Sequence, residues 1–281
     1  MQRTESTFTG ARGTPIVYDV WTPDTECTGL LVLSHGLGEH ARRYDHVIAR
    51  LGDLGLTVYA LDHRGHGRSG GKRLELTRWA DFTDDLHELF RIARAAHPAT
   101  KNFLLGHSMG GAIALSYALD HQQDLDALML SGPAVVLGDS TPKILVFVGK
   151  ILGRIAPGVP VQSLDSADVS RDPDVVAAYD NDPLVHHGKI PAGLAGQFVG
   201  AMESFPARVP SLTLPVLLQH GSDDKLADVS GSRMIAEKAG SSDLTIEVYD
   251  GLYHEVFNEP ENERVLDDLI RWLAPRVRES E

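Results

Sequence analysis

The stretch "GHSMGG", residues 106–111, follows the apolar run "NFLL" and opens the helical pattern "MGGAIALSYAL". A serine in the pattern G-x-S-x-G, placed where a strand turns into a helix, is typical of a tight turn that exposes a nucleophile. The turn strains the serine backbone and brings the residues two before and two after it together, so Gly106 and Gly110 are small for a steric reason. We call residues 106–110 the serine elbow. It predicts Ser108 as a nucleophile at the positive end of a helix.

On both sides of the serine elbow, short apolar runs alternate with longer amphipathic patterns. Several runs are apolar at every position, as in strands of a parallel sheet that is covered on both faces. The longer patterns repeat their apolar residues with the 3.6-residue period of a helix. The alternation predicts an α/β fold with a mostly parallel central sheet flanked by helices. The expected strands are "IVYDV", "LLVLS", "LTVYALD", "NFLLGHS", "LDALMLSGP", "PVLLQHG" and "LTIEVYD", and the expected helices span residues 41–54, 77–97, 109–121, 229–239 and 261–274.

One interval in this alternation is too long for a simple crossover. The strand that ends near Ser131 and the one that begins at Pro215 lie much farther apart than the roughly 30 residues of a βαβ unit allow. We expect residues 1–281 to form one domain and residues 139–205 to be an insertion in it. The insertion should cap the carboxyl edge of the sheet, where α/β sheets bind their ligands.

Composition and charge exclude several classes of protein. The chain has 39 acidic against 26 basic residues, a net charge of −13, which argues against a protein that binds nucleic acid by neutralising phosphates. The start "MQRTESTFTG" has no apolar segment of the secretory type, and the single Cys27 allows no internal disulfide. The most apolar segment, residues 144–157, is interrupted by Lys150 and Arg154 and is too short to span a bilayer. We therefore expect a cytoplasmic or peripherally membrane-associated protein.

A serine hydroxyl is a weak nucleophile and needs a base that is oriented by an acid, here in the chain order serine, acid, histidine. His254 lies in "GLYHEVFNEP", after the last expected strand and before the last expected helix. The acid should lie after the strand "PVLLQ", in "QHGSDDKLAD", which contains Asp223, Asp224 and Asp228. Spacing alone does not separate the first two of these carboxylates.

The negative charge that forms on an attacked carbonyl oxygen needs two preorganised hydrogen-bond donors. The backbone N–H of Met109, directly after the nucleophile, should be the first. The second should come from the loop "HGLGEHARRY", residues 35–44, which follows the strand "LLVLS". Leu37 is the expected donor in this loop, through its backbone N–H.

Taken together, "HGLGEHARRY", "LDHRGHGRSGG", "GHSMGGA", "DPLV", "HGSDDKLAD" and "GLYHEVFNEP" resemble the monoacylglycerol lipases of the serine α/β-hydrolase fold, in particular the mycobacterial type. The resemblance runs from about residue 8 to residue 274. "HGLGEH" followed by "RY" is more specific to this group than the serine elbow, which the whole superfamily shares.

The resemblance implies a role for each matching residue. It implies that Ser108 is the nucleophile, that His254 is the base, and that the acid, third after Gly221, is Asp224. It also implies that the oxyanion donors are Leu37 and Met109. Asp223 is then expected to be a solvent-facing turn residue, and Asp228 to cap the helix that begins near Val229.

The resemblance also implies a polar end of the site that receives glycerol, shaped by Glu39, Arg43 and His107. Tyr179, in "AYDNDPLV", matches a tyrosine of the family cap that faces this alcohol site. A structural ion pair between Glu39 and Arg43, and a packing role for Tyr179, are the alternatives.

Two further motifs are weak. "GHGRSG", residues 65–70, matches the dinucleotide fingerprint G-x-G-x-x-G, but it does not turn directly from a first strand into a helix. "HEVFN", residues 254–258, has Asn258 where a zinc motif needs a second histidine. We therefore expect neither a metal nor a cofactor.

The insertion contains a helical pattern with two different sides. Its basic side carries Lys143, Lys150 and Arg154, and we expect the helix to bury its apolar side. We hypothesise that these apolar residues line the entrance for an acyl chain and that the helix touches lipid surfaces. Packing on the core alone is the other reading. The apolar residues are Ile144, Phe147, Val148, Ile151, Leu152 and Ile155.

These features predict a cofactor-free serine hydrolase that cleaves monoacylglycerol to fatty acid and glycerol through an acyl-enzyme. The alternatives are a general carboxylesterase or lysophospholipase of the same fold, and a non-catalytic ligand-binding protein. The sequence does not indicate the acyl chain length, the preferred ester position or the oligomeric state.

Overall fold

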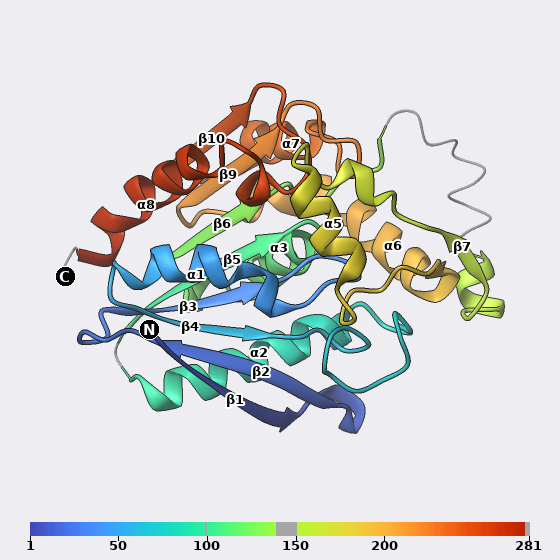
Figure 1. Cartoon of the computed structure of the whole chain (residues 1–281), viewed down its shortest axis with the longest axis horizontal. Helices are drawn as coiled ribbons and strands as arrows, with labels where there is room; N and C mark the ends of the chain where they lie inside the picture. Colours follow the sequence, from blue (N-terminus) through green and yellow to red (C-terminus); the bar gives the residue numbers. More distant parts are fainter. Residues whose placement is uncertain (99, 139–150, 279–281) are drawn as a thin grey trace.

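The computed structural model describes residues 1–98, 100–138 and 151–278. An eight-stranded sheet in the order β1-β2-β4-β3-β5-β6-β9-β10 crosses the molecule, with helices on both sides (Figure 1). β1 and β2 join it antiparallel, and the strands from β4 to β10 are parallel. The strands are β1 (Gln2–Thr9), β2 (Pro15–Thr22), β3 (Gly29–Ser34), β4 (Leu56–Leu61), β5 (Lys101–His107), β6 (Ala127–Ser131), β9 (Val216–Gly221) and β10 (Leu244–Tyr249).

Helices cover the two faces of the sheet in separate groups. α1 and α8 bury their apolar sides on one face, and α2, α3, α6 and α7 contribute to the core on the other. The helices are α1 (Asp45–Gly52), α2 (Ala80–Ala96), α3 (Met109–His121), α5 (Pro173–Asn181), α6 (Ala192–Arg208), α7 (Ser230–Lys238) and α8 (Asn262–Arg278), and the short 3-10 helices are η1 (Ala11–Gly13), η2 (Ala41–Tyr44), η3 (Gln122–Asp124), η4 (Ser166–Asp168), η5 (Val209–Ser211) and η6 (Val256–Asn258).

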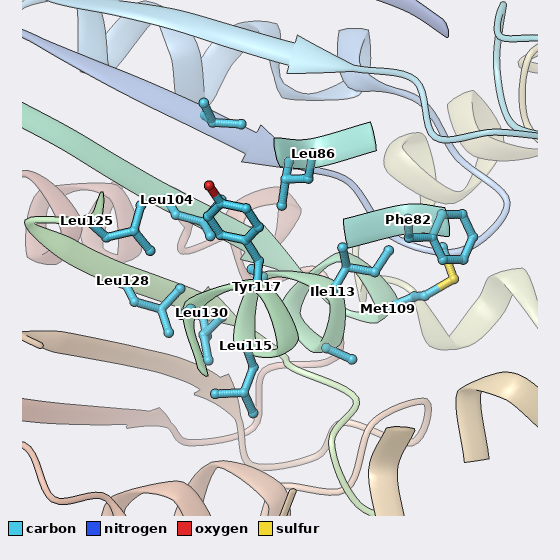
Figure 2. Packing of buried hydrophobic residues seen from close by; sticks show 14 of the residues in the cluster. Phe82, Leu86, Leu104, Met109, Ile113, Leu115, Tyr117, Leu125, Leu128 and Leu130 are labelled. Carbon is cyan, nitrogen blue, oxygen red and sulfur yellow. The ribbon is translucent and has the colours of Figure 1, made fainter. Parts of the chain in front are cut away.

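The parallel strands are buried on both faces, as their uninterrupted apolar sequences predict. In β3, Leu30 and Val32 belong to one core cluster, whereas Leu31 and Leu33 belong to the other. α3 lies at the centre of the first cluster, and Figure 2 shows its side chains packed against β5, β6 and α2. Since residues on every side of α3 are buried, its sequence is apolar all round rather than amphipathic. The predicted α/β-hydrolase architecture is confirmed.

Two differences from the expected elements have simple causes. β1 was not predicted, because it is a polar edge strand whose side chains are exposed except for a partly buried Phe8. The helix expected over residues 77–97 begins only at Ala80. The other expected helices and strands are present within a few residues of their predicted ends.

The elements between β6 and β9 lie beyond the carboxyl ends of the parallel strands (Figure 1). They include α5, α6 and the two short paired strands β7 (Pro160–Gln162) and β8 (Ile190–Pro191). α6 runs past residue 205, and its Leu194 and Phe205 are buried in the core cluster beside α3. The last helix of this segment therefore packs on the core as well as covering the sheet edge.

The start of the expected insertion helix, including Ile144, Phe147 and Val148, lies outside the described residues. Residues 151–155 are helical, with Leu152 half-buried. The prediction that this helix buries its apolar side is wrong for Ile151 and Ile155, which are 40% and 75% exposed. The reason is that Gly153 makes the close approach to α6: a Cβ there would lie 2.6 Å from the Ala192 carbonyl oxygen.

Candidate active site

The serine elbow joins β5 to α3. Ser108 directly precedes the first turn of α3 and has φ 55° and ψ −122°, in the left-handed region that a non-glycine residue rarely adopts. A Cβ on Gly106 would lie 2.5 Å from the Gly110 carbonyl oxygen, and one on Gly110 would lie 2.1 Å from that of Ser34. Both flanking positions must therefore be glycine, because a side chain at either one would overlap backbone atoms.

Of the three aspartates after β9, Asp224 is the one that faces His254. His254 Nδ1 lies 2.7 Å from Asp224 Oδ2, and the Asp224 side chain is fully buried while Asp223 is exposed. The other carboxylate oxygen, Oδ1, accepts the backbone N–H groups of Leu226 and Ala227, both at 2.8 Å. Asp224 thus has both oxygens occupied as acceptors. Its bond to Nδ1 leaves His254 Nε2 available for proton transfer.

Asp228 is close to its predicted position. Its Oδ1 accepts the backbone N–H of Ser230, the first residue of α7, at 2.9 Å. This bond satisfies one of the unpaired N–H groups at the start of the helix.

The electrostatics of the buried pair favour a charged acid and a basic imidazole. Although burial acts to raise it, the pKa of Asp224 lies well below its ordinary value because His254 and His220 face the carboxylate. Although burial acts to lower it, the pKa of His254 lies above its ordinary value of 6.5 because of the Asp224 carboxylate. The raised pKa makes His254 a stronger proton acceptor.

His254 lies next to the serine elbow. Its ring centroid is 4.7 Å from that of His107, the residue before Ser108. Gly132, which was not predicted as a site residue, lies next to the Asp224–His254 pair. Its φ is 48°, and a Cβ on it would be 3.2 Å from His254 Nδ1. Its position in "SGP", directly after a buried strand, was the available signal.

The expected oxyanion donors come from two different elements near Ser108. Met109 is buried at the first position of α3, and Leu37 is half-buried in the loop after β3. This loop lies against the nucleophile, because a Cβ on Gly36 would be 3.2 Å from Ser108 Cβ. Within the described part of the chain, neither the Leu37 nor the Met109 N–H has a backbone acceptor. Both are therefore free for an external oxygen.

Glu39 and Arg43 are part of a larger buried network. Glu39 Oε2 accepts from Arg43 Nη1 at 2.6 Å, and Glu39 Oε1 accepts from the Tyr44 hydroxyl at 2.6 Å. Arg43 also forms a two-pronged ion pair with Glu255, at 2.6 and 2.8 Å. Burial opposes the charge on Glu39, but Arg43 and the nearby histidines lower its pKa to about 2. The network ties the loop after β3 to the residue next to His254.

Glu255 was not identified from the sequence. Its partner Arg43 lies 212 positions away, and the motif "HEVFN" suggested only a failed zinc pattern. The available signal was Arg43 in the loop "HGLGEHARRY", because a buried arginine needs a carboxylate partner.

The remaining two predicted pocket residues lie around this network. Tyr179, on α5, is buried with its ring 4.8 Å from the Arg43 guanidinium carbon. It also lines a cavity of about 120 Å³ together with Leu37, Gly38 and His186. His107 is buried, and burial followed by the nearby His254 lowers its pKa to about 4. The structure therefore brings the predicted nucleophile, base, acid, oxyanion loop and polar residues to one end of the sheet.

The motif at residues 65–70, which resembles a dinucleotide fingerprint, does not lie at the start of a helix. Residues 65–70 form a largely buried loop after β4, and this loop does not lead directly into α2, which begins at Ala80. Across residues 1–98, 100–138 and 151–278, no group of three or more His, Cys, Asp or Glu side chains could hold a metal ion. In the same ranges, no helix combines the length and the apolar character needed to cross a membrane.

Comparison with known proteins identifies the family of the chain. The family model described as serine aminopeptidase, S33, matches residues 25–261. A monoacylglycerol lipase of Mycolicibacterium smegmatis is 52% identical over 275 residues, covering 98% of both chains. The rat monoglyceride lipase is 34% identical, over 92% of this chain and 86% of the other.

Solved structures extend the comparison to three dimensions. The crystal structure of Paleococcus ferrophilus monoacylglycerol lipase has a TM-score of 0.83 and 33% identity, and the match covers 98% of this chain and all of the other. The chain belongs to the serine aminopeptidase S33 family of α/β-hydrolases and, within it, to the group of the monoacylglycerol lipases.

Proposed function

We propose that the protein hydrolyses monoacylglycerol to a fatty acid and glycerol. The observation that carries the proposal is the Asp224–His254 pair beside the strained Ser108, with a buried polar network and a small cavity next to it. The names of the similar proteins, which are carboxylic ester hydrolases, support the same reaction class.

The reaction takes two proton-balanced stages. In the first, Ser108 Oγ bonds to the ester carbonyl carbon while His254 Nε2 takes the hydroxyl proton. The oxyanion is held by the N–H groups of Leu37 and Met109. When the tetrahedral intermediate collapses, the ester bond breaks and His254 returns the proton to the departing glycerol oxygen. Water then attacks the acyl-enzyme by the same steps, releasing the fatty acid and regenerating Ser108.

The polar network supports glycerol, rather than a phosphate ester, as the leaving group. Arg43 is already paired with two carboxylates, those of Glu39 and Glu255. This end of the site therefore carries excess negative charge and repels a phosphate. We expect kcat/KM for 1-monooleoylglycerol to exceed that for lysophosphatidylcholine by at least about tenfold.

The proposal is tested by glycerol release from 1-monooleoylglycerol. The wild-type protein should release glycerol and fatty acid in equal amounts, and Ser108→Ala should reduce turnover by about 10⁶-fold, to background. A Ser116→Ala variant, which removes a buried hydroxyl of α3, controls for effects on folding. Turnover that survives in Ser108→Ala would contradict the mechanism, and absence of turnover in the wild-type protein would favour a ligand-binding role.

We also propose that the segment after residue 150 contacts lipid surfaces. Among the described residues, four of the six exposed large apolar side chains lie between residues 151 and 161. They are at the end of the molecule opposite both termini (Figure 1). This concentration supports a site for docking at the surface where the substrate resides. We call it the apolar tip, and it consists of Ile151, Ile155, Val159 and Val161.

A further inference from the structure

His35, the first residue after β3, has both ring nitrogens bonded to the backbone. Its Nε2 accepts the backbone N–H of His63 at 2.8 Å, and its Nδ1 lies 2.8 Å from the Gly36 carbonyl oxygen. A backbone N–H can only donate, so Nε2 carries no proton and the Nδ1–H donates to Gly36. The ring is fully buried, and burial lowers the pKa of His35, which keeps it neutral. The two bonds therefore fix a single tautomer.

The Nδ1–H bond acts on the peptide unit that contains the expected oxyanion donor. The Gly36–Leu37 peptide bond is trans, so its carbonyl and its N–H point in opposite directions. Because His35 holds the carbonyl on one side, the Leu37 N–H is directed to the other. The preceding N–H, of Gly36, is fixed as well, by Glu39 Oε1 at 2.5 Å. The Gly36–Leu37 peptide therefore cannot rotate without breaking the His35 bond to its carbonyl, and the Glu39 bond fixes the peptide before it.

The surroundings of His35 make this hold rigid. Its ring packs against the rings of His63 and His66, with centroids 4.5 and 5.4 Å away, and neither neighbour donates to Gly36. His63 Nε2 pairs with the Ser34 hydroxyl, and His66 Nδ1 lies 3.0 Å from the Arg64 carbonyl oxygen. Among the described residues, His35 alone holds the Gly36 carbonyl.

We propose that His35 is a positioning residue that aligns the Leu37 N–H with the oxyanion by holding the Gly36 carbonyl. The proposal rests on the proposed ester hydrolysis, in which Leu37 is a donor. A donor that must reorient during reaction loses most of its effect, because oxyanion stabilisation depends on preorganisation. His35 therefore raises the rate of the chemical step without contacting the substrate.

Two substitutions separate this role from simple packing. In His35→Asn, the short side-chain amide places an N–H near the former Nδ1 and keeps a donor for the Gly36 carbonyl. In His35→Gln, the longer side chain places its amide near the former Nε2 and keeps an acceptor for the His63 N–H. Each variant retains one of the two bonds and loses the other.

The test measures kcat and KM for p-nitrophenyl butyrate, a soluble ester, and inhibition by phenylboronic acid, which forms a tetrahedral adduct with serine. We expect His35→Gln to lower kcat by about 10²-fold with KM within about twofold, because one oxyanion donor is misaligned. Binding of the boronic acid should weaken with it. His35→Asn should keep kcat at least about tenfold above that of His35→Gln.

Several outcomes would overturn the proposal. Equal kcat values in the two variants, or a higher one in His35→Gln, would assign His35 a packing role. His66→Gln, which disturbs the same buried ring cluster without touching Gly36, is the control, and its kcat should stay within a few-fold of wild type. If the variants do not fold, nitrogen-15 spectra of wild-type His35 decide: a proton on Nε2 would refute the arrangement.

The proposed function fails separately from this inference. Absence of ester turnover in the wild-type protein refutes the proposed hydrolysis, whatever the variants do. An active wild type that is silenced by Ser108→Ala, together with equal His35 variants, refutes only the positioning role.

Discussion

At the residue scale, Asp223 and Asp224 follow one another in the chain but differ in what an amide would do at each position. Both oxygens of Asp224 accept N–H donors, from Leu226 and Ala227 on one side and His254 on the other. An asparagine there must turn its NH₂ group toward one of these donors. We expect Asp224→Asn to lower kcat on 1-monooleoylglycerol by about 10³- to 10⁴-fold.

Asp223→Asn is the matched control for this prediction. The Asp223 side chain is exposed and, within the described ranges, accepts only the hydroxyl of Ser222. Its kcat should remain within about twofold of wild type, as for other exposed substitutions. If the two variants exchanged these results, Asp223 would be the orienting acid.

The pH dependence of the reaction should report His254. The base works only when it is neutral, and Asp224 raises the pKa of His254 above 6.5. Activity is therefore lost as pH falls through this raised pKa. His107, whose pKa is lowered to about 4, stays neutral over the same range. We expect kcat/KM to fall with a slope of one proton, with its midpoint above 6.5. A slope of two protons would show that a second histidine titrates with it.

The site residues differ in how far the sequence could assign them. Ser108 and His254 stand in local motifs whose neighbours predict their surroundings. Asp224 needed the family resemblance, because spacing does not distinguish adjacent carboxylates. Glu255 and the hold of His35 on Gly36 became visible only in the folded chain. Both depend on which ring nitrogen or carboxylate faces which partner, and a sequence pattern does not contain that information.

At the element scale, the serine elbow between β5 and α3 tolerates no side chain at Gly106 or Gly110. A methyl group on Gly110 would lie 2.1 Å from the Ser34 carbonyl oxygen, which is backbone of β3 and cannot move away. We expect Gly110→Ala to lower the free energy of unfolding by more than about 3 kcal/mol, as severe overpacking does. Urea denaturation followed by circular dichroism measures the loss.

Gly200, inside α6, provides the opposite case. It is exposed, and a Cβ on it would meet nothing within 4 Å. Gly200→Ala should therefore raise the free energy of unfolding by about 0.5 to 1 kcal/mol, since alanine favours the helix. If Gly200→Ala destabilised the protein as much as Gly110→Ala, the contact with β3 would not be what distinguishes Gly110.

At the scale of the whole molecule, the sheet was predictable because its strands are buried on both faces and leave continuous apolar runs. The arrangement of the segment between β6 and β9 was not. Its contacts with the loop after β3 include the His186 N–H bonded to the Gly38 carbonyl at 2.7 Å and His40 paired with Asp182 at 2.8 Å. These polar contacts join segments far apart in sequence, and no hydrophobic period marks them.

The net charge of the molecule and its apolar tip together determine how the protein reaches a substrate in a lipid surface. The net charge of −13 disfavours attraction to anionic lipids, so binding at the apolar tip must come from apolar burial. We expect the protein to co-sediment with neutral phosphatidylcholine vesicles and to do so equally at low and high salt. Replacing Ile155 and Val159 by serine should weaken this binding by at least about tenfold, because each buried aliphatic side chain contributes about 1.5 to 3 kcal/mol.

The control for the tip is Val248→Ser, on the edge strand β10, where a valine with nearly the same exposure as Val159 lies outside the tip. It should leave vesicle binding unchanged. Turnover of soluble p-nitrophenyl butyrate should stay within about twofold in all variants, because the tip acts on delivery of substrate from a surface and not on the chemical step. Vesicle binding that is unchanged in the Ile155 and Val159 double variant would exclude the tip as the lipid contact.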